Sequence, residues 1–430
     1  MAAKEEAQVQ KATGMPEDWA IVLVGFLIII ITLIGLIVPV PAYSWKEGGD
    51  FANKIFSGVN LGKIGSQFLY VFAIGTLIVG LLGKSIKTFL TVFPVVAILT
   101  LIALILAGSA QMEALKLEAV IFSLSIGLLV GNTVKLPQWF REGLSAELFV
   151  KIGLVLLGTT INFNAIVKDG LLGLVQALVV VVSVWYFAYW VCKRFKLDDE
   201  LSLMLSSAVS ICGVSAAIAT AGAIKGDPKK LSYIISLVLI TAIPMMIFMP
   251  YIADYFGFSQ KVTGAWLGGS IDTTGAVVAS GTLAGEVARE TSTIVKFSQN
   301  VLLGLAAFAI SIYWTYAQKT PSSVTVEKPT LRLIWDRFPK FVLGFIAASL
   351  VFSFIITPAQ LGAEKLTAVK DSLKSIQTLW FVLAFTSIGL ETKFSDLFNS
   401  ESKKPLYAFL IAQFFNIIVT LIIAFLLFGE

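Results

Sequence analysis

The sequence predicts an all-α polytopic membrane protein, and its charge content and its apolar runs both point to this fold class. Hydrophobic residues make up 57 % of the 430 residues and charged residues only 14 %, whereas a typical soluble domain is about 25 % charged. Continuous apolar runs near the roughly 20-residue spanning length recur along the chain. Strands of a membrane barrel would alternate in polarity instead. The composition therefore excludes a soluble enzyme and predicts helices that cross a bilayer.

The charge balance and the missing histidine narrow the function classes further. The chain has 32 Lys+Arg, 27 Asp+Glu and no His, and a net charge of +5 is typical of a positive-inside bias rather than of nucleic-acid binding. Without His, no Ser-His-Asp triad, His-based zinc site or His proton relay can form. Two cysteines cannot build a disulfide framework or a four-Cys metal site. We therefore expect no catalytic residue, no enzyme activity, no cofactor and no nucleic-acid partner.

Thirteen apolar runs organise the chain. Residues 1–18 are polar and predict a cytoplasmic tail before a signal anchor, and residues 19–430 predict a single transmembrane domain of the transporter type. Trp45–Lys63 and Gln318–Lys340 read as connections, the first in the membrane interface and the second in the cytoplasm. The runs are Trp19–Val40, Gln67–Leu82, Thr88–Ala107, Leu117–Gly131, Leu148–Ile161, Leu171–Cys192, Leu201–Ala223, Leu231–Ala253, Val262–Gly281, Thr291–Ala317, Phe341–Thr357, Ile376–Leu390 and Leu406–Phe428.

Two pairs of similar segments indicate an internal repeat. Val155–Phe163 resembles Val382–Leu390, and Ser210–Gly222 resembles Ser270–Gly281. Duplicated units of this kind are typical of secondary transporters. We place the repeat units at about residues 146–256 and, permuted, at about 262–318 plus 376–430. The sequence thus predicts an inverted-repeat transporter fold.

Inversion constrains which runs cross the bilayer. If all thirteen runs span, Ser210–Gly222 and Ser270–Gly281 run in the same direction, which inverted repeats forbid. The conflict disappears if Leu201–Ala223 and Val262–Gly281 are re-entrant hairpins or broken helices, which leaves eleven full spans. The distribution of Lys and Arg between the two sides favours this second arrangement as well.

The segment SICGVSAAIAT, at 210–220, places small polar residues in the middle of an apolar run. A helix broken at Gly213 would free backbone N–H groups, and such groups at a helix N-terminus attract anions. Irregular backbone at membrane depth is tolerated where it lines a cavity. The alternative is close helix packing through small residues. The candidate substrate-binding residues here are Ser210, Cys212, Gly213 and Ser215.

The segment GGSIDTTG, at 268–275, contains the acidic residue that lies most clearly inside an apolar run, Asp272. Ionisable residues at membrane depth are expensive and indicate function. Asp272 could bind Na⁺, carry a proton or pair with a cation; alternatively it could cap a half-helix as its N-cap residue. The candidate substrate-binding residues around it are Gly269, Ser270, Thr273, Thr274 and Gly275.

Lys296 lies close to the start of a predicted helix. It could extend to the interface, balance the charge of Asp272 or hold an anion. Asn300 shares its helix face at i+4. The repeat tips add hydroxyls that could bind substrate or simply satisfy helix backbone; these are Thr159, Thr160, Thr386 and Ser387.

Four blocks carry a resemblance to a known family: ICGVSAAIATA, GGSIDTTGAVVASG followed by TIVKF, RFPKFVLGF and SIGLETKFSDL. They resemble the sulfate exporter (YeiH-like) family of bacterial inner-membrane transporters from about Val59 to the C-terminus. That family is similar to the bile-acid symporter and cation/proton antiporter group. The resemblance implies two inverted repeats, a core with crossed broken helices, a homodimer and a multi-pass location in the bacterial inner (plasma) membrane.

These patterns lead to one main hypothesis and one alternative. The main hypothesis is a secondary active transporter of a small anion, such as sulfate, sulfite or an organosulfonate, with the site between the two broken helices. Asp272, Lys296 and Asn300 would serve coupling to Na⁺ or H⁺, with a possible Na⁺ site at Asp272. The alternative is a Na⁺/proton antiporter that uses Asp272, and a passive channel is a third reading.

Overall fold

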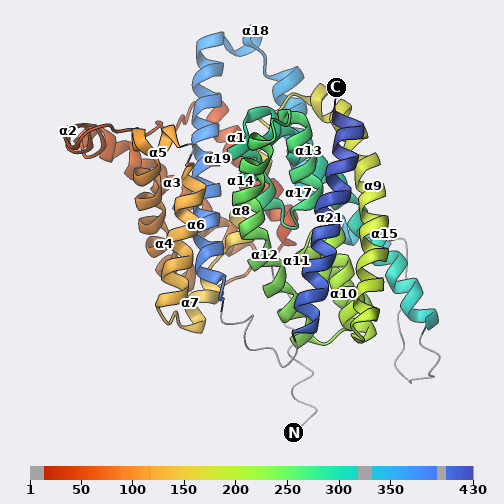
Figure 1. Ribbon diagram of the computed structural model, residues 1–430. Helices are drawn as coiled ribbons and strands as arrows, with labels where there is room; N and C mark the ends of the chain where they lie inside the picture. Colours follow the sequence, from red (N-terminus) through yellow and green to blue (C-terminus); the bar gives the residue numbers. More distant parts are fainter. Residues whose placement is uncertain (1–13, 116, 318–331, 395–402, 430) are drawn as a thin grey trace. The chain divides into compact units, whose positions relative to one another are not determined.

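The computed structural model describes residues 14–115, 117–317, 332–394 and 403–429, and these residues form an all-helical protein with one isolated bridge between Trp45 and Ser109. Within these ranges seven helices are long and apolar enough to cross a membrane (Figure 1). They are α3 (Gly58–Leu81), α4 (Ile86–Ala107), α9 (Phe163–Arg194), α12 (Pro228–Tyr255), α15 (Glu286–Ala317), α19 (Ala363–Glu391) and α21 (Lys404–Phe428). The predicted all-α polytopic class is confirmed.

The other four predicted spans form shorter helices, and whether each of them crosses the bilayer stays a prediction. They are α1 (Glu17–Leu33), α6 (Ala119–Thr133), α8 (Ala146–Leu157) and α17 (Lys340–Leu350) with its π-helical continuation η3 (Val351–Ile355). Short helices connect the rest: α2 (Gly48–Asp50), η2 (Phe51–Ile55), α5 (Ala110–Ala114), α7 (Gln138–Gly143), α16 (Arg332–Arg337) and α18 (Pro358–Leu361).

The predicted connections are only partly right. The stretch expected to be a connection at Trp45–Lys63 contains α2, η2 and the first turns of α3, because Ser57 accepts a hydrogen bond from Asn60 N and starts that helix early. The predicted cytoplasmic tail is covered only in part, since residues 1–13 lie outside the described residues. The same holds for most of the predicted linker, at 318–331.

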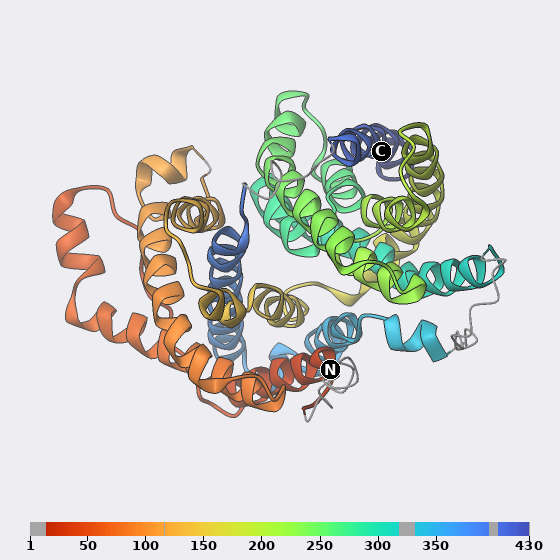
Figure 2. The same ribbon diagram turned by 90° about the horizontal axis from the view of Figure 1, so that it is seen from below.

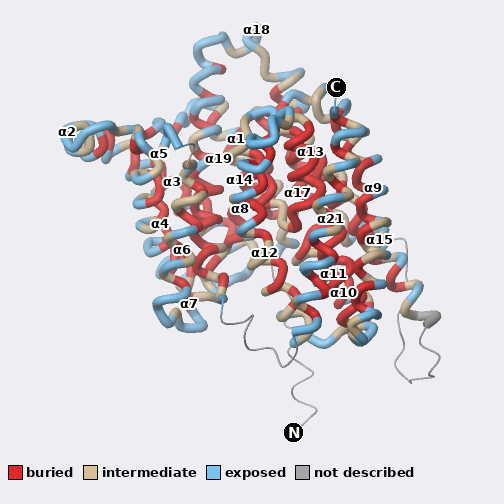
Figure 3. Tube along the Cα trace, viewed as in Figure 1, coloured by how far each residue is buried: buried red, intermediate tan, exposed pale blue. Residues whose placement is uncertain are grey.

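The described helices group into two compact units. Unit 1 comprises Met1–Asn162 and Lys340–Glu391, and unit 2 comprises Phe163–Pro339 and Thr392–Glu430. In both units buried residues recur along the helices, and Figure 3 shows them as red stretches.

Unit 1 is organised around α19. Its Trp380 side chain is fully buried and packs against Phe149 of α8, with 5.3 Å between the ring centroids. On another face α19 approaches α6 through glycines: a Cβ added at Gly389 would lie 2.6 Å from Leu124 O and 2.7 Å from Leu128 N. The glycine is therefore needed for this close approach of two helix backbones.

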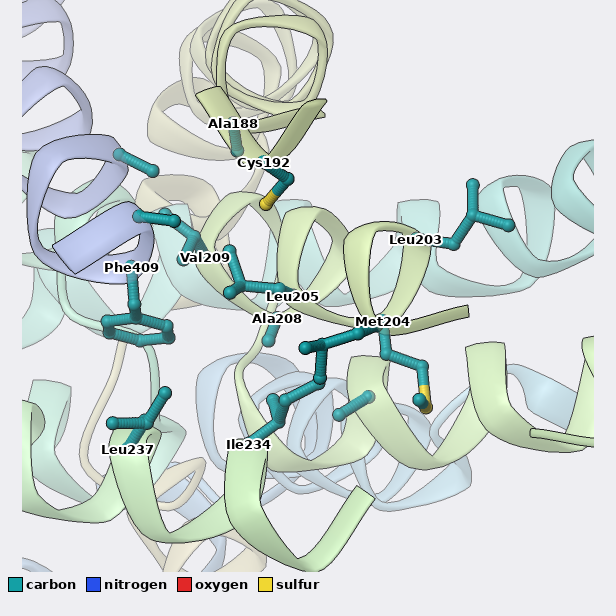
Figure 4. Close-up of a cluster of buried hydrophobic side chains, with 14 of the residues drawn as sticks. Ala188, Cys192, Leu203, Met204, Leu205, Ala208, Val209, Ile234, Leu237 and Phe409 are labelled. Atoms are coloured by element: carbon teal, nitrogen blue, oxygen red, sulfur yellow. The ribbon is translucent and has the colours of Figure 1, made fainter. Parts of the chain in front are cut away.

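Unit 2 is organised around α15 and a hydrophobic core between α9, α12, α21 and the helix α10 (Asp199–Ser210). Side chains from these four helices interdigitate in that core, among them Cys192, Leu205, Leu237 and Phe409 (Figure 4). Figure 2, which looks along the helices, shows α21 lying beside α9. This packing fixes the positions of these four helices relative to one another.

The first interrupted segment is a helical hairpin. It consists of α10 and α11 (Val214–Ile224), each about 18 Å long or less and too short to cross a bilayer alone. The two ends of the hairpin lie together. Lys230 Nζ, in the first turn of α12, which follows α11, bonds Asp198 Oδ1 at 2.8 Å and Glu200 Oε2 at 3.2 Å, at the start of α10.

The second interrupted segment repeats this arrangement. It consists of α13 (Gln260–Ser270) and α14 (Thr274–Ala284). Gln260 Oε1, at the start of α13, accepts a hydrogen bond from Val287 N, just after α14, at 3.1 Å. Within unit 2, α10 and α11 lie toward one end and α13 and α14 toward the other (Figure 1). Both segments thus turn back on themselves instead of running straight through.

The contact between α6 and α19 predicts the effect of adding a single methyl group. Gly389→Ala places its Cβ against backbone atoms that cannot move independently, so we expect the free energy of unfolding to fall by about 1–3 kcal/mol. The control is Gly65→Ala on α3, where nothing lies within 4 Å of the added Cβ; it should be neutral or slightly stabilising. Thermal unfolding of the purified protein compares the two, and equal melting temperatures would contradict this packing.

Candidate functional site

The tips of the two hairpins share one register. The first helix ends at Ser210 in one hairpin and at Ser270 in the other, and the second helix begins at Val214 and Thr274. The predicted similarity between 210–222 and 270–281 therefore corresponds to equivalent structural elements. The other predicted pair does not: 155–163 runs from α8 into α9, whereas 382–390 lies inside the continuous helix α19.

The two tips touch each other at Gly213. This residue has a φ of +61°, a conformation that favours glycine. A Cβ added there would lie 3.1 Å from Asp272 Cβ of the other tip. The break predicted at Gly213 is confirmed, since α11 begins at the next residue. Backbone geometry and close approach thus both require a glycine at this point.

Lys296 joins the two tips, and its predicted place near the start of a helix is wrong. The helix begins at Glu286, so Lys296 lies in the third turn of α15 and is only 1 % exposed. Its Nζ donates to Ile211 O and Ile271 O, each at 2.8 Å, and to Gln299 Oε1 at 2.9 Å. All three ammonium protons are used. Extension of this side chain to the interface is therefore excluded.

Amide side chains complete the capping of the two C-terminal half-helix ends. Gln299 Nε2 donates to Ser210 O at 2.9 Å and to Gly269 O at 3.3 Å. From α21, Asn416 Nδ2 donates to Val209 O at 3.1 Å, and Gln413 Nε2 donates to Ser270 O at 2.7 Å. A helix C-terminus leaves carbonyls without intrahelical partners and carries a partial negative charge. Lys296 and these amides satisfy both needs.

Sequence reasoning missed the capping role of three amides. Gln413 and Asn416 lie three residues apart on one face of α21, each at most 3 % exposed, and Gln299 lies three residues after Lys296. Their spacing inside apolar runs was the available signal. It was not decisive, because amides in membrane helices also bond neighbouring helices without any site nearby.

The N-terminal ends of the second half-helices are different. No side chain of the described residues caps α11 at Gly213 or α14 at Thr273. The N-cap of α14 is Thr273, so the alternative that Asp272 is the N-cap is wrong. Ser215, Thr273 and Thr274 place half-buried hydroxyls in these first turns. The partial positive charges of two helix N-termini are therefore left without a side-chain acceptor.

Asp272 lies between these groups and is 2 % exposed. Its Oδ2 accepts no hydrogen bond from any described residue. Lys296 is close enough to interact electrostatically with Asp272, but it donates its protons to two backbone carbonyls and to Gln299 Oε1. The equivalent position of the other tip is Cys212, a buried cysteine that forms no disulfide. A buried carboxylate without a partner is costly unless a cation or a proton neutralises it.

The remaining predicted residues of the hairpins lie at or beside the crossing. Ser210 donates its hydroxyl to Ser206 O at 2.7 Å and Ser270 donates to Trp266 O, both within their own helices. A Cβ at Gly269 would meet Gln176 and Thr420 side chains, and Gly275 is buried. Asn300 Nδ2 donates to Thr274 Oγ1 at 3.1 Å. Their contact with a ligand stays a prediction.

The hydroxyls predicted at the other repeat tips belong to unit 1. Thr159 and Thr160 donate to Leu156 O and Leu157 O at 2.8 and 2.9 Å. Ser387 Oγ donates to Leu383 O at 2.9 Å, and Thr386 Oγ1 bonds Thr100 Oγ1 at 2.8 Å. These bonds fit the alternative in which the hydroxyls satisfy helix backbone and neighbouring helices. A role in substrate binding stays a prediction.

The fold and this crossing define a multi-pass α-helical membrane protein with two interrupted helical hairpins. The family model described as "Conserved hypothetical protein 698" matches residues 91–408, and the chain belongs to that family. It is 38 % identical over 397 residues to "UPF0324 membrane protein RB9488" of Rhodopirellula baltica, covering 91 % of this chain and 72 % of that protein.

Further bacterial relatives are similar over much of the chain. A "UPF0324 membrane protein" of Nitratidesulfovibrio vulgaris is 36 % identical over 365 residues, covering 83 % of this chain and 62 % of the relative. "UPF0324 membrane protein NE0724" of Nitrosomonas europaea is 30 % identical over 316 residues, with 67 % and 64 % covered. The chain thus spans less than two thirds of these two relatives. No solved structure gives a significant match.

The capping geometry predicts that Lys296 is essential for stability. Lys296→Met leaves two buried carbonyls and Gln299 Oε1 without their donor, so we expect the free energy of unfolding to fall by about 2 kcal/mol or more. The matched control is Lys229→Met, an exposed lysine of the same unit, which should change it by less than about 0.5 kcal/mol. Thermal unfolding in detergent measures both. A Lys296→Met protein as stable as the wild type would contradict the bridging role.

Proposed function

We propose that this protein is a secondary active transporter of a small anion, such as sulfate, sulfite or an organosulfonate. The observation that carries the proposal is that side chains bond one kind of half-helix end and not the other. The C-terminal ends of α10 and α13 are bonded by Lys296, Gln299 and α21 amides, whereas no side chain caps the N-terminal ends of α11 and α14. Uncapped N-termini bind anions.

The fold proposed for this activity is an inverted repeat with two re-entrant hairpins, related to the bile-acid symporter and cation/proton antiporter group. Equivalent tips at 210–214 and 270–274 support it, as does the return of each hairpin to its own starting point. In such folds the site lies at the repeat interface and access alternates between the two sides. A homodimer in the bacterial inner membrane completes the proposal.

The substrate class follows from the donors at the crossing. The donors are the backbone N–H groups at two helix starts and the hydroxyls of Ser215, Thr273 and Thr274. Among the described residues, no carboxylate accepts a hydrogen bond from any of them. A compact oxyanion with several acceptor oxygens uses many such donors at once, as a sulfur oxyanion does. Lys296 acts indirectly, because its three protons are already bound to protein oxygens.

Asp272 gives the transporter a means of coupling. With its carboxylate ionised, it repels an anion placed at the neighbouring helix starts. Na⁺ or H⁺ at Asp272 removes this repulsion, so the anion and the cation favour each other's binding. Asn300 Oδ1, which also has no partner among the described residues, offers a further oxygen beside Thr274. We propose Asp272 and Asn300 as the coupling site and Lys296 as the fixed counter-charge.

One observation favours the alternative, a Na⁺/proton antiporter. Asp272 Oδ2 is buried without a hydrogen-bond donor. Such an oxygen suits Na⁺ or a proton as the transported substrate itself, and not only as a coupling ion. In that case the helix starts would stabilise the Asp272 carboxylate itself. The two functions differ in whether cation exchange requires an anion.

Flux into proteoliposomes tests the proposal. We expect saturable uptake of labelled sulfate, sulfite or taurine-type sulfonates driven by a Na⁺ or H⁺ gradient. Ser215→Ala removes one donor to the anion and should raise the half-saturating concentration about tenfold. Asp272→Asn should uncouple uptake from the cation gradient. Ser236→Ala, on an exposed face of α12, is the matched control and should behave like the wild type.

Two outcomes count against the anion transporter. Unchanged flux in both Ser215→Ala and Asp272→Asn would refute the site. Dissipation of a pH gradient on addition of Na⁺ alone, with no anion present and lost in Asp272→Asn, would establish the antiporter instead.

A further inference from the structure

Unit 1 contains a cavity of about 360 Å³ that the transport site does not use. It lies between the chain segment that follows α1 and the helices α3, α4 and α19, with Pro41, Leu104 and Leu379 forming apolar walls. Ligand pockets of about 300–1,000 Å³ with apolar walls and a few convergent polar groups are typical binding sites.

The segment 38–45 contributes one wall of the cavity, and hydrogen bonds hold it at several points along its length. Ser372 Oγ donates to Val38 O at 2.9 Å. Asn60 holds Ala42 twice, accepting from Ala42 N at 2.8 Å and donating to Ala42 O at 2.9 Å. Trp45 N donates to Gly108 O at 2.9 Å. An extended segment with these bonds at both ends keeps its shape, so the cavity is preformed.

Two polar side chains, Gln67 and Tyr43, are among the residues that line this space. Gln67 is 1 % exposed, and its Nε2 donates to Ser375 Oγ at 2.7 Å, which fixes both groups at the cavity edge. The Tyr43 hydroxyl is buried and has no hydrogen-bond partner among the described residues. Burial raises the pKa of Tyr43, so the phenol keeps its proton and is available as a donor at neutral pH.

The rim carries one charge of each sign. Asp371 and Lys374 both line the cavity from α19 and are exposed. Residues three apart on a helix have Cβ atoms about 5–6 Å apart. Neither forms an ion pair with any described residue, although their spacing allows one with each other. Two free opposite charges that line one cavity suit a ligand that carries both signs.

We propose that this cavity binds a zwitterion whose acidic group and ammonium group are a few bonds apart. Lys374 and the Tyr43 hydroxyl receive the acidic group, Asp371 receives the ammonium group, and Leu104 and Leu379 contact the apolar part. The head group of an ethanolamine phospholipid and a small free aminosulfonate or phosphoethanolamine share this chemistry. The site lies wholly within unit 1 and does not depend on the proposed anion transport.

Binding measurements on the full chain test this site without a transport assay. Native mass spectrometry with phosphatidylethanolamine, and calorimetry with free phosphoethanolamine and taurine, should detect a ligand. Tyr43→Phe, Lys374→Gln and Asp371→Asn should each weaken binding about tenfold. Lys370→Gln removes an exposed charge of the same helix that does not line the cavity, and it should leave binding unchanged.

Each result either assigns the ligand or overturns the proposal. Loss of lipid binding in the three variants, with no binding of the free zwitterions, assigns the site to the lipid; binding of the free zwitterions with the same pattern assigns it to a soluble ligand. Binding that is unchanged in the three variants overturns the proposal, and so does no binding at all. If phosphatidylglycerol binds as tightly as phosphatidylethanolamine, and Asp371→Asn does not weaken that binding, the ligand is not a zwitterion. Tyr43→Phe loses a single oxygen that has no partner, so it should fold like the wild type.

Discussion

The crossing in unit 2 depends on one ammonium group. Interrupting a helix at membrane depth leaves carbonyls without partners in a region that offers no water, and each of them is costly. Lys296 Nζ bonds the carbonyl of the C-cap residue of both interrupted half-helices, Ile211 O and Ile271 O, at 2.8 Å each. Its positive charge also faces the negative ends of two helix dipoles. A single residue of α15 therefore makes two breaks tolerable at once.

The rest of the crossing follows from that bridge. Once the C-terminal ends of α10 and α13 are fixed to α15 and α21, the second half-helices must begin at the same depth, and their N-terminal groups converge there. The two tips are not chemically equal: one carries Cys212 where the other carries Asp272. This difference places a single carboxylate beside two positive helix ends, which is the arrangement from which both anion binding and cation coupling are inferred.

Residue types differ in how well the sequence predicts their place in the fold. Gly213 and the Ser-Ile register of both tips predicted the breaks correctly, because glycine and small polar residues are rarely placed mid-span without a reason. The sequence predicts Lys296 near a helix start, because the apolar run begins at Thr291; in the structure α15 begins earlier, at Glu286. Gln413 and Asn416 gave no distinct signal, since only the three-dimensional packing of α21 brings them to Ser270 and Val209.

We infer that the two interrupted segments are hairpins that enter the bilayer from opposite sides and meet at Lys296. Single cysteines in a protein lacking Cys192 and Cys212 test it most directly, with a membrane-impermeant maleimide added to either side. Cysteines at Asp199 and Lys225 should react from one side, and cysteines at Lys261 and Glu286 should react from the other. Reaction of the two members of either pair from opposite sides would mean that the segment crosses the membrane, and it would contradict this account.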